Sequence, residues 1–199
     1  MTKIKLCGIS RLEDISAVNE LKPEYIGFVF AKNSKRFVSP SMAAQLKEKL
    51  LDSIQAVGVF VNEPVENVAK LLKENTIDVA QLHGSEDHDY IMKLRNLINK
   101  PIIKAFRIND IANMECCSAD YVLIDSGAGS GKTFKWNLIK NLKRPFFLAG
   151  GLDAQNVNDA VNEIHPFAVD VSSGIESNGV KDYTKMAKFV AAVRKEERL

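Results

Sequence analysis

The stretch LIDSGAGSGKTFKW, residues 123–136, joins an apolar run to an acidic residue, a glycine-rich loop and a lysine. Glycine-rich loops that follow strands often bind phosphate, so two nucleotide-binding motifs have to be compared with it. A Walker P-loop requires a glycine five positions before Gly131, where the chain has Ser126. The dinucleotide fingerprint G-x-G-x-x-G requires a third glycine at the position of Lys132. The stretch matches neither motif, and the rest of the chain has to decide the fold.

Short runs rich in β-branched and aromatic residues recur along the chain, each ended by a turn signal. Their continuous apolar character, without alternation, is typical of strands that are covered on both faces of a parallel sheet. We expect strands at residues 3–8, 25–30, 54–61, 79–84, 101–108, 121–126, 145–151 and 166–173.

Helical patterns lie between these strands and begin at recognisable start signals. Ser39-Pro40, Glu63-Pro64 and Asp153 precede three of them, whereas the segment 136–142 supplies barely two turns. The last pattern, 181–195, places five apolar or aromatic side chains on one face: Tyr183, Met186, Phe189, Val190 and Val193.

Eight strands thus alternate with eight helical or near-helical segments over 199 residues. The spacing of roughly 25 residues per unit fits a short strand, a helix of about 11 residues and two tight loops. Because the Rossmann glycine signature is missing, this pattern favours a (β/α)8 TIM barrel over a doubly wound sheet. No linker interrupts the pattern, so we expect residues 1–199 to form one domain.

The composition is that of an ordinary globular protein, with 46% hydrophobic and 26% charged residues. Basic and acidic residues are intermixed, and the net charge of +2 predicts neither a nucleic-acid nor a membrane partner. The first ten residues contain no apolar core of a signal peptide, so we expect a cytoplasmic protein. Three cysteines, of which Cys116 and Cys117 are adjacent, argue against disulfides; we assign this pair to packing.

In a (β/α)8 barrel, the active site lies at the carboxyl ends of the strands. Cys7 ends the first expected strand and, as buried cysteines usually are, could be a small hydrophobe. It could instead be a general base, for which we expect its pKa to fall from about 8.5 toward neutrality. Asp125 ends the sixth and is either an acid partner or a helix cap. His83 is either a core residue or a ligand-binding residue, and no grouping of ligands predicts a metal site. Two further polar candidates at this end are Arg36 and Asp170.

Small residues cluster after three successive strands, the sixth, seventh and eighth. One such loop would be explained by turn chemistry alone, but three predict a phosphate site, which this architecture often builds after its last strands. The candidate residues are Gly129, Ser130, Gly131, Lys132, Gly150, Gly151, Ser172, Ser173 and Gly174.

Seven short motifs at the expected strand ends make the chain similar, from end to end, to the phosphoribosylanthranilate isomerase family of tryptophan biosynthesis. These motifs are KLCGI (5–9), GFVF…SKRFVSP (27–40), GVFVN (58–62), QLHGSE (81–86), LIDS…GSGKTFKW (123–136), LAGGL (148–152) and AVDVSSGIES (168–177).

The resemblance implies a cofactor-free Amadori rearrangement of N-(5'-phosphoribosyl)anthranilate. Asp125 would be the general acid that protonates the ring oxygen, and Cys7 the general base that removes the C2 proton. Arg36 would pair with the anthranilate carboxylate, and Asp170 would lie near the substrate's nitrogen and hydroxyls. The small-residue loops would hold the phosphate, and His83 would contact substrate in a role that stays open. The chain would act as a monomer or a homodimer.

Two departures from the family pattern are a short loop after the sixth strand and Lys135, where aspartate is common. Other interpretations are a different phosphosugar enzyme on the same barrel, a non-catalytic phosphate-binding module and a nucleotide hydrolase. A metal-dependent epimerase would need His and Asp ligands on several strands, and this chain has only three histidines. A histidine-pathway isomerase typically pairs two aspartates, whereas this chain has Cys7 at the first strand. Retention of both Cys7 and Asp125 argues against the binding module.

Overall fold

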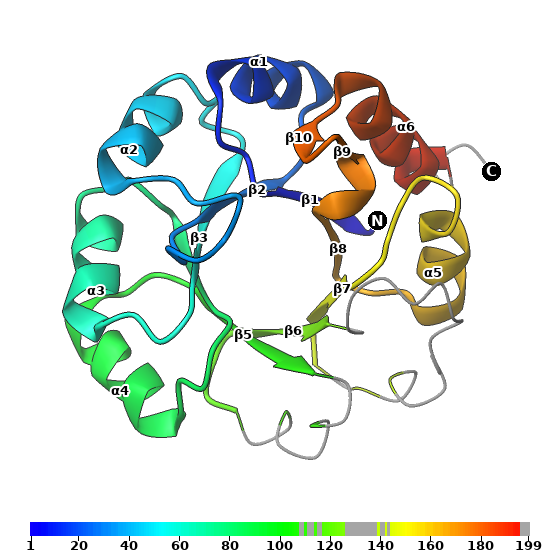
Figure 1. Ribbon diagram of the computed structural model, residues 1–199. Helices are drawn as coiled ribbons and strands as arrows, with labels where there is room; N and C mark the ends of the chain where they lie inside the picture. Colours follow the sequence, from blue (N-terminus) through cyan, green and yellow to red (C-terminus); the bar gives the residue numbers. More distant parts are fainter. Residues whose placement is uncertain are drawn as a thin grey trace.

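The computed structural model describes residues 1–107, 110, 114, 117–125, 139, 142 and 144–195. Eight parallel strands close into a barrel in which each strand pairs with its neighbours along the chain and β8 pairs with β1 (Figure 1). The predicted (β/α)8 barrel is therefore confirmed, and every strand lies within its predicted range. The strands are β1 Lys3–Cys7, β2 Tyr25–Val29, β3 Gln55–Phe60, β4 Val79–Leu82, β5 Ile102–Arg107, β6 Tyr121–Asp125, β7 Phe146–Ala149 and β8 Ala168–Val171.

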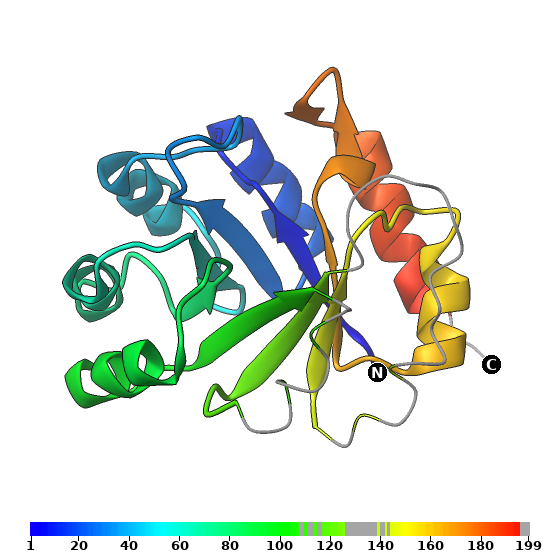
Figure 2. The same cartoon turned by 60° about the horizontal axis from the view of Figure 1, so that its bottom comes forward.

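The described helices lie around most of the barrel and cover the outer face of the sheet there (Figures 1 and 2). Their inner faces pack against the outward side chains of the strands in one large apolar cluster, to which Cys117 also contributes. In the described residues the helices are α1 Leu12–Leu21, α2 Pro40–Glu48, α3 Val65–Lys73, α4 His88–Leu97, α5 Val157–Ile164 and α6 Tyr183–Arg194. None of these helices is long and apolar enough to cross a bilayer.

The helix start signals were informative at most positions. The Ser39 hydroxyl accepts the N–H of Met42 and caps α2, and α3 begins directly after Pro64. The prediction that α5 begins directly after Asp153 is wrong, because the helix begins at Val157. The Asp153 carboxylate accepts the N–H groups of Gln155 and Asn156 in a turn before the helix. The segment 136–142 lies largely outside the described residues.

The predicted apolar face of α6 is correct for four of its five members. Met186, Phe189, Val190 and Val193 are buried, whereas the side chain of Tyr183 is exposed. Tyr183 is the first residue of the helix, and its hydroxyl hydrogen-bonds to Glu20 on the surface instead of packing inward.

The interior of the barrel changes character along its axis. Near the amino ends of the strands, the rings of Tyr25, Tyr121, Phe147 and Phe167 pack against one another with centroids 4.9–5.8 Å apart. Toward the carboxyl ends, small side chains and polar groups replace these rings. The barrel is thus filled by packing at one end and leaves room for a ligand at the other.

A two-stranded hairpin follows β8 and projects beside α6 (Figure 2). It comprises β9 Glu176–Ser177 and β10 Val180–Lys181, which pair antiparallel across Asn178 and Gly179. Both turn residues have positive φ angles, as a two-residue Asn-Gly turn requires. The hairpin carries Glu176 and Lys181 back toward the end of β1.

Candidate active site

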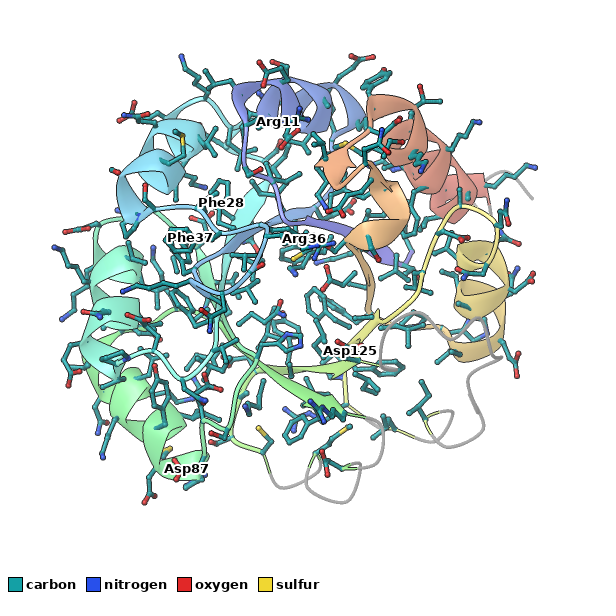
Figure 3. The ribbon with its side chains drawn as sticks, viewed as in Figure 1. Arg11, Phe28, Arg36, Phe37, Asp87 and Asp125 are labelled. Atoms are coloured by element: carbon teal, nitrogen blue, oxygen red, sulfur yellow. The ribbon has the colours of Figure 1, made fainter. Side chains whose placement is uncertain are left out.

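A pocket of about 360 Å³ opens at the carboxyl ends of the strands. It brings together most of the site residues predicted from the sequence, on β1, β6 and β8 and in the loops after β2, β4, β7 and β8. Figure 3 shows Arg36 and Asp125 near the centre of the barrel, whereas Arg11 and Asp87 lie at its periphery. The predicted residues that line the pocket are Cys7, Arg36, His83, Asp125, Gly150, Gly151, Asp170, Ser172 and Ser173. Gly129, Ser130, Gly131 and Lys132 lie outside the described residues.

The thiol of Cys7 points into the barrel because Cys7 shares the inward face of β1 with Lys3 and Lys5. Its neighbour on β2 is Gly27, and a Cβ on Gly27 would lie 2.6 Å from the Cys7 sulfur. A side chain at this position of β2 would therefore collide with the thiol. Glycine in the GFVF motif thus makes room for the candidate base.

Burial raises the pKa of the Cys7 thiol above its ordinary value. Lys5 and Lys181 act in the opposite direction, while Asp170 adds to the rise. The expectation of a pKa lowered toward neutrality is therefore wrong in direction. Once deprotonated, a thiolate of raised pKa is the stronger base, and the two ammonium groups beside it are suited to stabilise that form.

Lys5 is a site residue that sequence reasoning missed. It is fully buried inside the barrel, and its Nζ lies 3.0 Å from Oδ1 of Asp170, its register partner on β8. Burial opposes the charge on Lys5, but Asp170 and Cys7 outweigh it and raise the pKa of the ammonium. Removing either partner would leave a buried charge uncompensated, which typically costs about 3–5 kcal/mol. The ion pair thus holds a buried ammonium group behind Asp170, which lines the pocket.

A chain of polar contacts leads from β4 to Asp125. The Gln81 amide nitrogen lies 2.9 Å from Nδ1 of His83, and Nε2 of His83 lies 3.5 Å from Oδ2 of Asp125. If the amide donates to Nδ1, the imidazole carries its proton on Nε2, facing the carboxylate. The Gln81 oxygen is buried and has no hydrogen-bond partner among the described residues. His83 is thereby placed beside the candidate acid.

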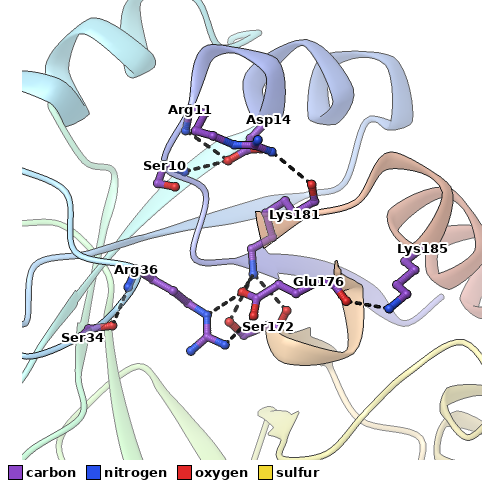
Figure 4. Close-up of polar contacts among 9 residues, drawn as sticks. All are labelled: Ser10, Arg11, Asp14, Ser34, Arg36, Ser172, Glu176, Lys181 and Lys185. Atoms are coloured by element: carbon purple, nitrogen blue, oxygen red, sulfur yellow. Dashed lines mark hydrogen bonds and ion pairs between the residues drawn. The ribbon is translucent and has the colours of Figure 1, made fainter. Parts of the chain in front are cut away.

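Arg36 reaches the pocket by crossing Gly8, whose φ angle is +81°. A Cβ at Gly8 would lie 2.5 Å from Cδ of Arg36 and 3.2 Å from Nζ of Lys181. The guanidinium forms a bidentate ion pair with Glu176, at 2.6 Å from Nε and 2.7 Å from Nη2 (Figure 4). Lys181 donates to the same carboxylate at 2.6 Å. Sequence reasoning missed both Glu176 and Lys181, since only the hairpin brings them to the pocket.

This cluster predicts an acid-dependent loss of stability. Burial opposes ionisation of Glu176, but hydrogen bonds from Arg36 and Lys181 outweigh it and lower its pKa to about 2. An unfolded glutamate titrates near about 4.3, so the carboxylate stabilises the fold above that pH, and the contribution is lost as the pH falls toward 2. With solvent screening, its size is about 1–2 kcal/mol.

Urea unfolding of the wild type and of Glu176→Gln at pH 7 and pH 2.5 measures this contribution. The variant should be the less stable protein at pH 7. The difference in the free energy of unfolding should shrink at pH 2.5, where Glu176 is protonated in the unfolded chain and partly protonated in the folded protein. An equal difference at both pH values would contradict a charged, paired Glu176.

The loops after β7 and β8 approach each other closely at the predicted phosphate site. Gly150 and Gly151 have φ angles of +97° and +63°, which favour glycine. A Cβ on Gly174 would lie 2.0 Å from the carbonyl oxygen of Leu152, so only glycine fits there. Gly174 does not line the pocket itself but lets the two loops meet. The absence of side chains at these glycines lets a ligand come close to the backbone, as phosphate binding requires.

Within the described residues, no cluster of three or more His, Cys, Asp and Glu side chains is arranged to hold a metal ion. The groups that converge on the pocket are instead a thiol, a carboxylate beside an imidazole, an arginine and two loops of small residues. This arrangement suits proton transfer on a small anionic ligand.

Known proteins are similar to this chain over nearly its whole length. A model of the N-(5'phosphoribosyl)anthranilate (PRA) isomerase family matches residues 4–192. N-(5'-phosphoribosyl)anthranilate isomerase of Endomicrobium trichonymphae is 46% identical over 199 residues, which cover 98% of this chain and 99% of that protein.

Two crystal structures are also similar, and each similarity covers 98% of this chain and 100% of the other. Phosphoribosyl anthranilate isomerase in complex with reduced 1-(o-carboxyphenylamino)-1-deoxyribulose 5-phosphate has a TM-score of 0.86 and 33% identity. Monomers of the dimeric phosphoribosylanthranilate isomerase from Thermotoga maritima have a TM-score of 0.85 and 33% identity. The chain therefore belongs to the N-(5'-phosphoribosyl)anthranilate isomerase family.

Proposed function

We propose that this protein catalyses the Amadori rearrangement of N-(5'-phosphoribosyl)anthranilate to 1-(2-carboxyphenylamino)-1-deoxy-D-ribulose 5-phosphate, a step of tryptophan biosynthesis. The observation that carries the proposal is that Cys7 on β1 and Asp125 on β6 line one pocket in a chain of this family. The reaction needs one acid and one base at a sugar ring, and the pocket supplies one of each.

Asp125 acts first, as the general acid. Its carboxyl proton passes to the ring oxygen of the ribose, the bond between that oxygen and C1 breaks, and the ring opens to a protonated Schiff base. Asp125 is left as a carboxylate beside Nε2 of His83, 3.5 Å away. The polar Nε2–H group that faces this carboxylate stabilises electrostatically the charge that develops on the acid.

Cys7 acts second, as the general base. Its thiolate removes the proton from C2, and the electron pair of the C–H bond moves toward the positive nitrogen to give an enolamine. The enolamine then takes a proton at C1 and loses the hydroxyl proton at C2, which yields the ketone. Lys5 and Lys181 stabilise the thiolate, since the positive charge of each favours the deprotonated form of Cys7.

The two anionic ends of the substrate hold it between the acid and the base. The phosphate binds at Gly150, Gly151 and the loop 172–174, together with the predicted residues 129–132. Asp170, whose side chain is paired with Lys5, lies near the substrate's nitrogen and hydroxyls. Binding energy from these remote contacts keeps the ring where proton transfer occurs.

Arg36 binds the anthranilate carboxylate, so Arg36→Met should weaken substrate binding. We expect the KM to rise by about 10–100-fold, the effect of losing a charge-assisted pair, with a smaller change in kcat. Steady-state kinetics on the fluorescent substrate measure both constants. An unaltered KM in the folded variant would contradict the carboxylate contact.

Expression in a tryptophan auxotroph that lacks this isomerase tests the function in a cell. The wild-type protein should restore growth without tryptophan, and Cys7→Ala should not. Failure of a folded, expressed wild type to restore growth would contradict the function.

We further infer that the enzyme works in the cytoplasm, as a monomer or a homodimer. Light scattering in solution distinguishes these two oligomeric states.

A further inference from the structure

The hairpin after β8 supplies two charged groups that the proposed mechanism leaves without a complete role. Oε1 of Glu176 accepts hydrogen bonds from Nε of Arg36 and Nζ of Lys181, each at 2.6 Å, and Oε2 accepts from Nη2 of Arg36 at 2.7 Å (Figure 4). The side chains of Glu176 and Lys181 are 9% and 2% exposed, whereas that of Arg36 is 32% exposed. The carboxylate therefore lies behind the arginine, on the side away from solvent.

The ion pair occupies only one edge of the guanidinium. A guanidinium has five N–H donors, and Glu176 takes one from Nε and one from Nη2. The second N–H of Nη2 and both N–H groups of Nη1 form another edge, which suits a second carboxylate in the same bidentate geometry. Arg36 itself lines the pocket with Cys7 and Asp125, so a ligand there can reach it.

The charges in the cluster favour such a second anion. Two cations, Arg36 and Lys181, share the single carboxylate of Glu176 and leave one positive charge uncompensated among these three groups. Without Glu176, the long Arg36 side chain would sample many rotamers and would lose that freedom when a ligand bound. Because Glu176 already holds Arg36 in one conformation, this loss of conformational entropy does not occur on binding.

Lys181 links the cluster to the other end of the pocket. Its Nζ also donates to the backbone carbonyl of Ser172 at 2.9 Å, in the loop proposed to hold the phosphate. One ammonium therefore joins the arginine that faces the carboxylate of the substrate to the loop that faces its phosphate. The hairpin fixes the spacing between the two anionic ends.

We propose that Glu176, anchored by Lys181, is a positioning residue that presents the outer edge of Arg36 to the aromatic carboxylate of the substrate. The inference rests on the proposed function and adds the residues that orient its carboxylate-binding arm. Glu176 touches no reacting atom and acts on the carboxylate of the substrate through Arg36.

A double-mutant cycle tests this dependence. Glu176→Gln keeps the shape of the side chain but removes its charge and turns an N–H group toward the guanidinium. We expect Glu176→Gln to raise the KM for N-(5'-phosphoribosyl)anthranilate by about tenfold, with the dissociation constant of the reduced product analogue rising in parallel and kcat nearly unchanged. In the Arg36→Met background, the same substitution should have no further effect on either constant.

Two control variants separate positioning from general damage. Asp120→Asn removes a carboxylate that pairs with Arg95 at 2.9 Å, away from the pocket, and should leave KM unchanged. Glu176→Asp keeps the negative charge and is the second variant if Glu176→Gln folds poorly. Its KM should lie between those of the wild type and Glu176→Gln. Thermal melting of each variant shows whether it is folded at the assay temperature.

Three outcomes overturn the inference: an unchanged KM in folded Glu176→Gln, an effect of the same size in the Arg36→Met background, or a fall in kcat without a rise in KM. Each of these leaves the proposed function intact, provided that the wild type converts the substrate. A wild type that neither converts the substrate nor binds the reduced product analogue overturns the proposed function and this inference with it.

Discussion

Cys7→Ala should lower kcat by about 10²–10⁴-fold, the usual contribution of a positioned general base. The variant should keep the fold and should still bind the reduced product analogue, because Arg36 and the phosphate loops remain. Cys7→Ser should be nearly as inactive, since a hydroxyl deprotonates far less readily than a thiol. The decay of substrate fluorescence measures kcat directly.

Cys117→Ala is the matched control for this prediction. Cys117 is also a free thiol, but it packs against the apolar layer between helices and sheet. The Cys117→Ala variant should therefore retain the wild-type kcat. Near-wild-type turnover by folded Cys7→Ala would remove the thiol from the mechanism, and another group in the pocket would have to be the base.

Asp125→Asn should lower kcat to a similar extent, because an amide has nearly the same shape but cannot deliver the proton that opens the ring. The matched control is Asp120→Asn, since Asp120 immediately precedes β6 and Asp125 ends it. Asp120 supports the structure by accepting the N–H of Ile102 and pairing with Arg95, so its loss should affect stability more than kcat.

A substrate deuterated at C2 distinguishes the two catalytic roles. Cys7 removes the C2 proton in the second step, and Asp125 opens the ring in the first. If ring opening is slowed, it limits the rate and masks the isotope effect of the second step. We expect a smaller isotope effect on kcat in Asp125→Asn than in the wild type. An unchanged kcat, or an isotope effect that grows, would place the acid elsewhere.

The barrel was predictable because its strands are covered on both faces and therefore appear as continuous apolar runs. β2 shows this most clearly, since all five of its residues are buried. The start of α5 and the exposure of Tyr183 were not predictable from such patterns, because both depend on local hydrogen bonds at a helix terminus.

The pocket was predicted in outline, but not the electrostatics around the thiol. Cys7 and Asp125 stand at strand ends, so barrel topology alone brings them to one face. Lys5 has the hydropathy of a surface residue, although its position two residues before Cys7 places it on the same inward face. Burial raises the pKa of Cys7, whereas we expected it to fall. The sequence does not show how deeply a side chain is buried, so this direction could not be predicted from it.

Glu176 and Lys181 illustrate a second limit of sequence reasoning. They are five residues apart, and their contact with Arg36, 140 residues away from Glu176, depends on the turn at Asn178 and Gly179. Glu176 lies within the AVDVSSGIES motif, but nothing in the local pattern links either residue to Arg36. The roles of residues 129–132 stay predictions, because those residues lie outside the described part of the chain.

The most direct test of the central claim is a progress curve with purified wild-type protein. N-(5'-phosphoribosyl)anthranilate is generated in place from anthranilate and phosphoribosyl pyrophosphate, its fluorescence is followed, and the product is identified by mass and chromatographic retention. The account predicts rapid decay with the wild type, formation of the 1-deoxyribulose 5-phosphate derivative, and only background decay with Cys7→Ala. No acceleration by the folded wild type would contradict the isomerase function and direct the search to other sugar phosphates.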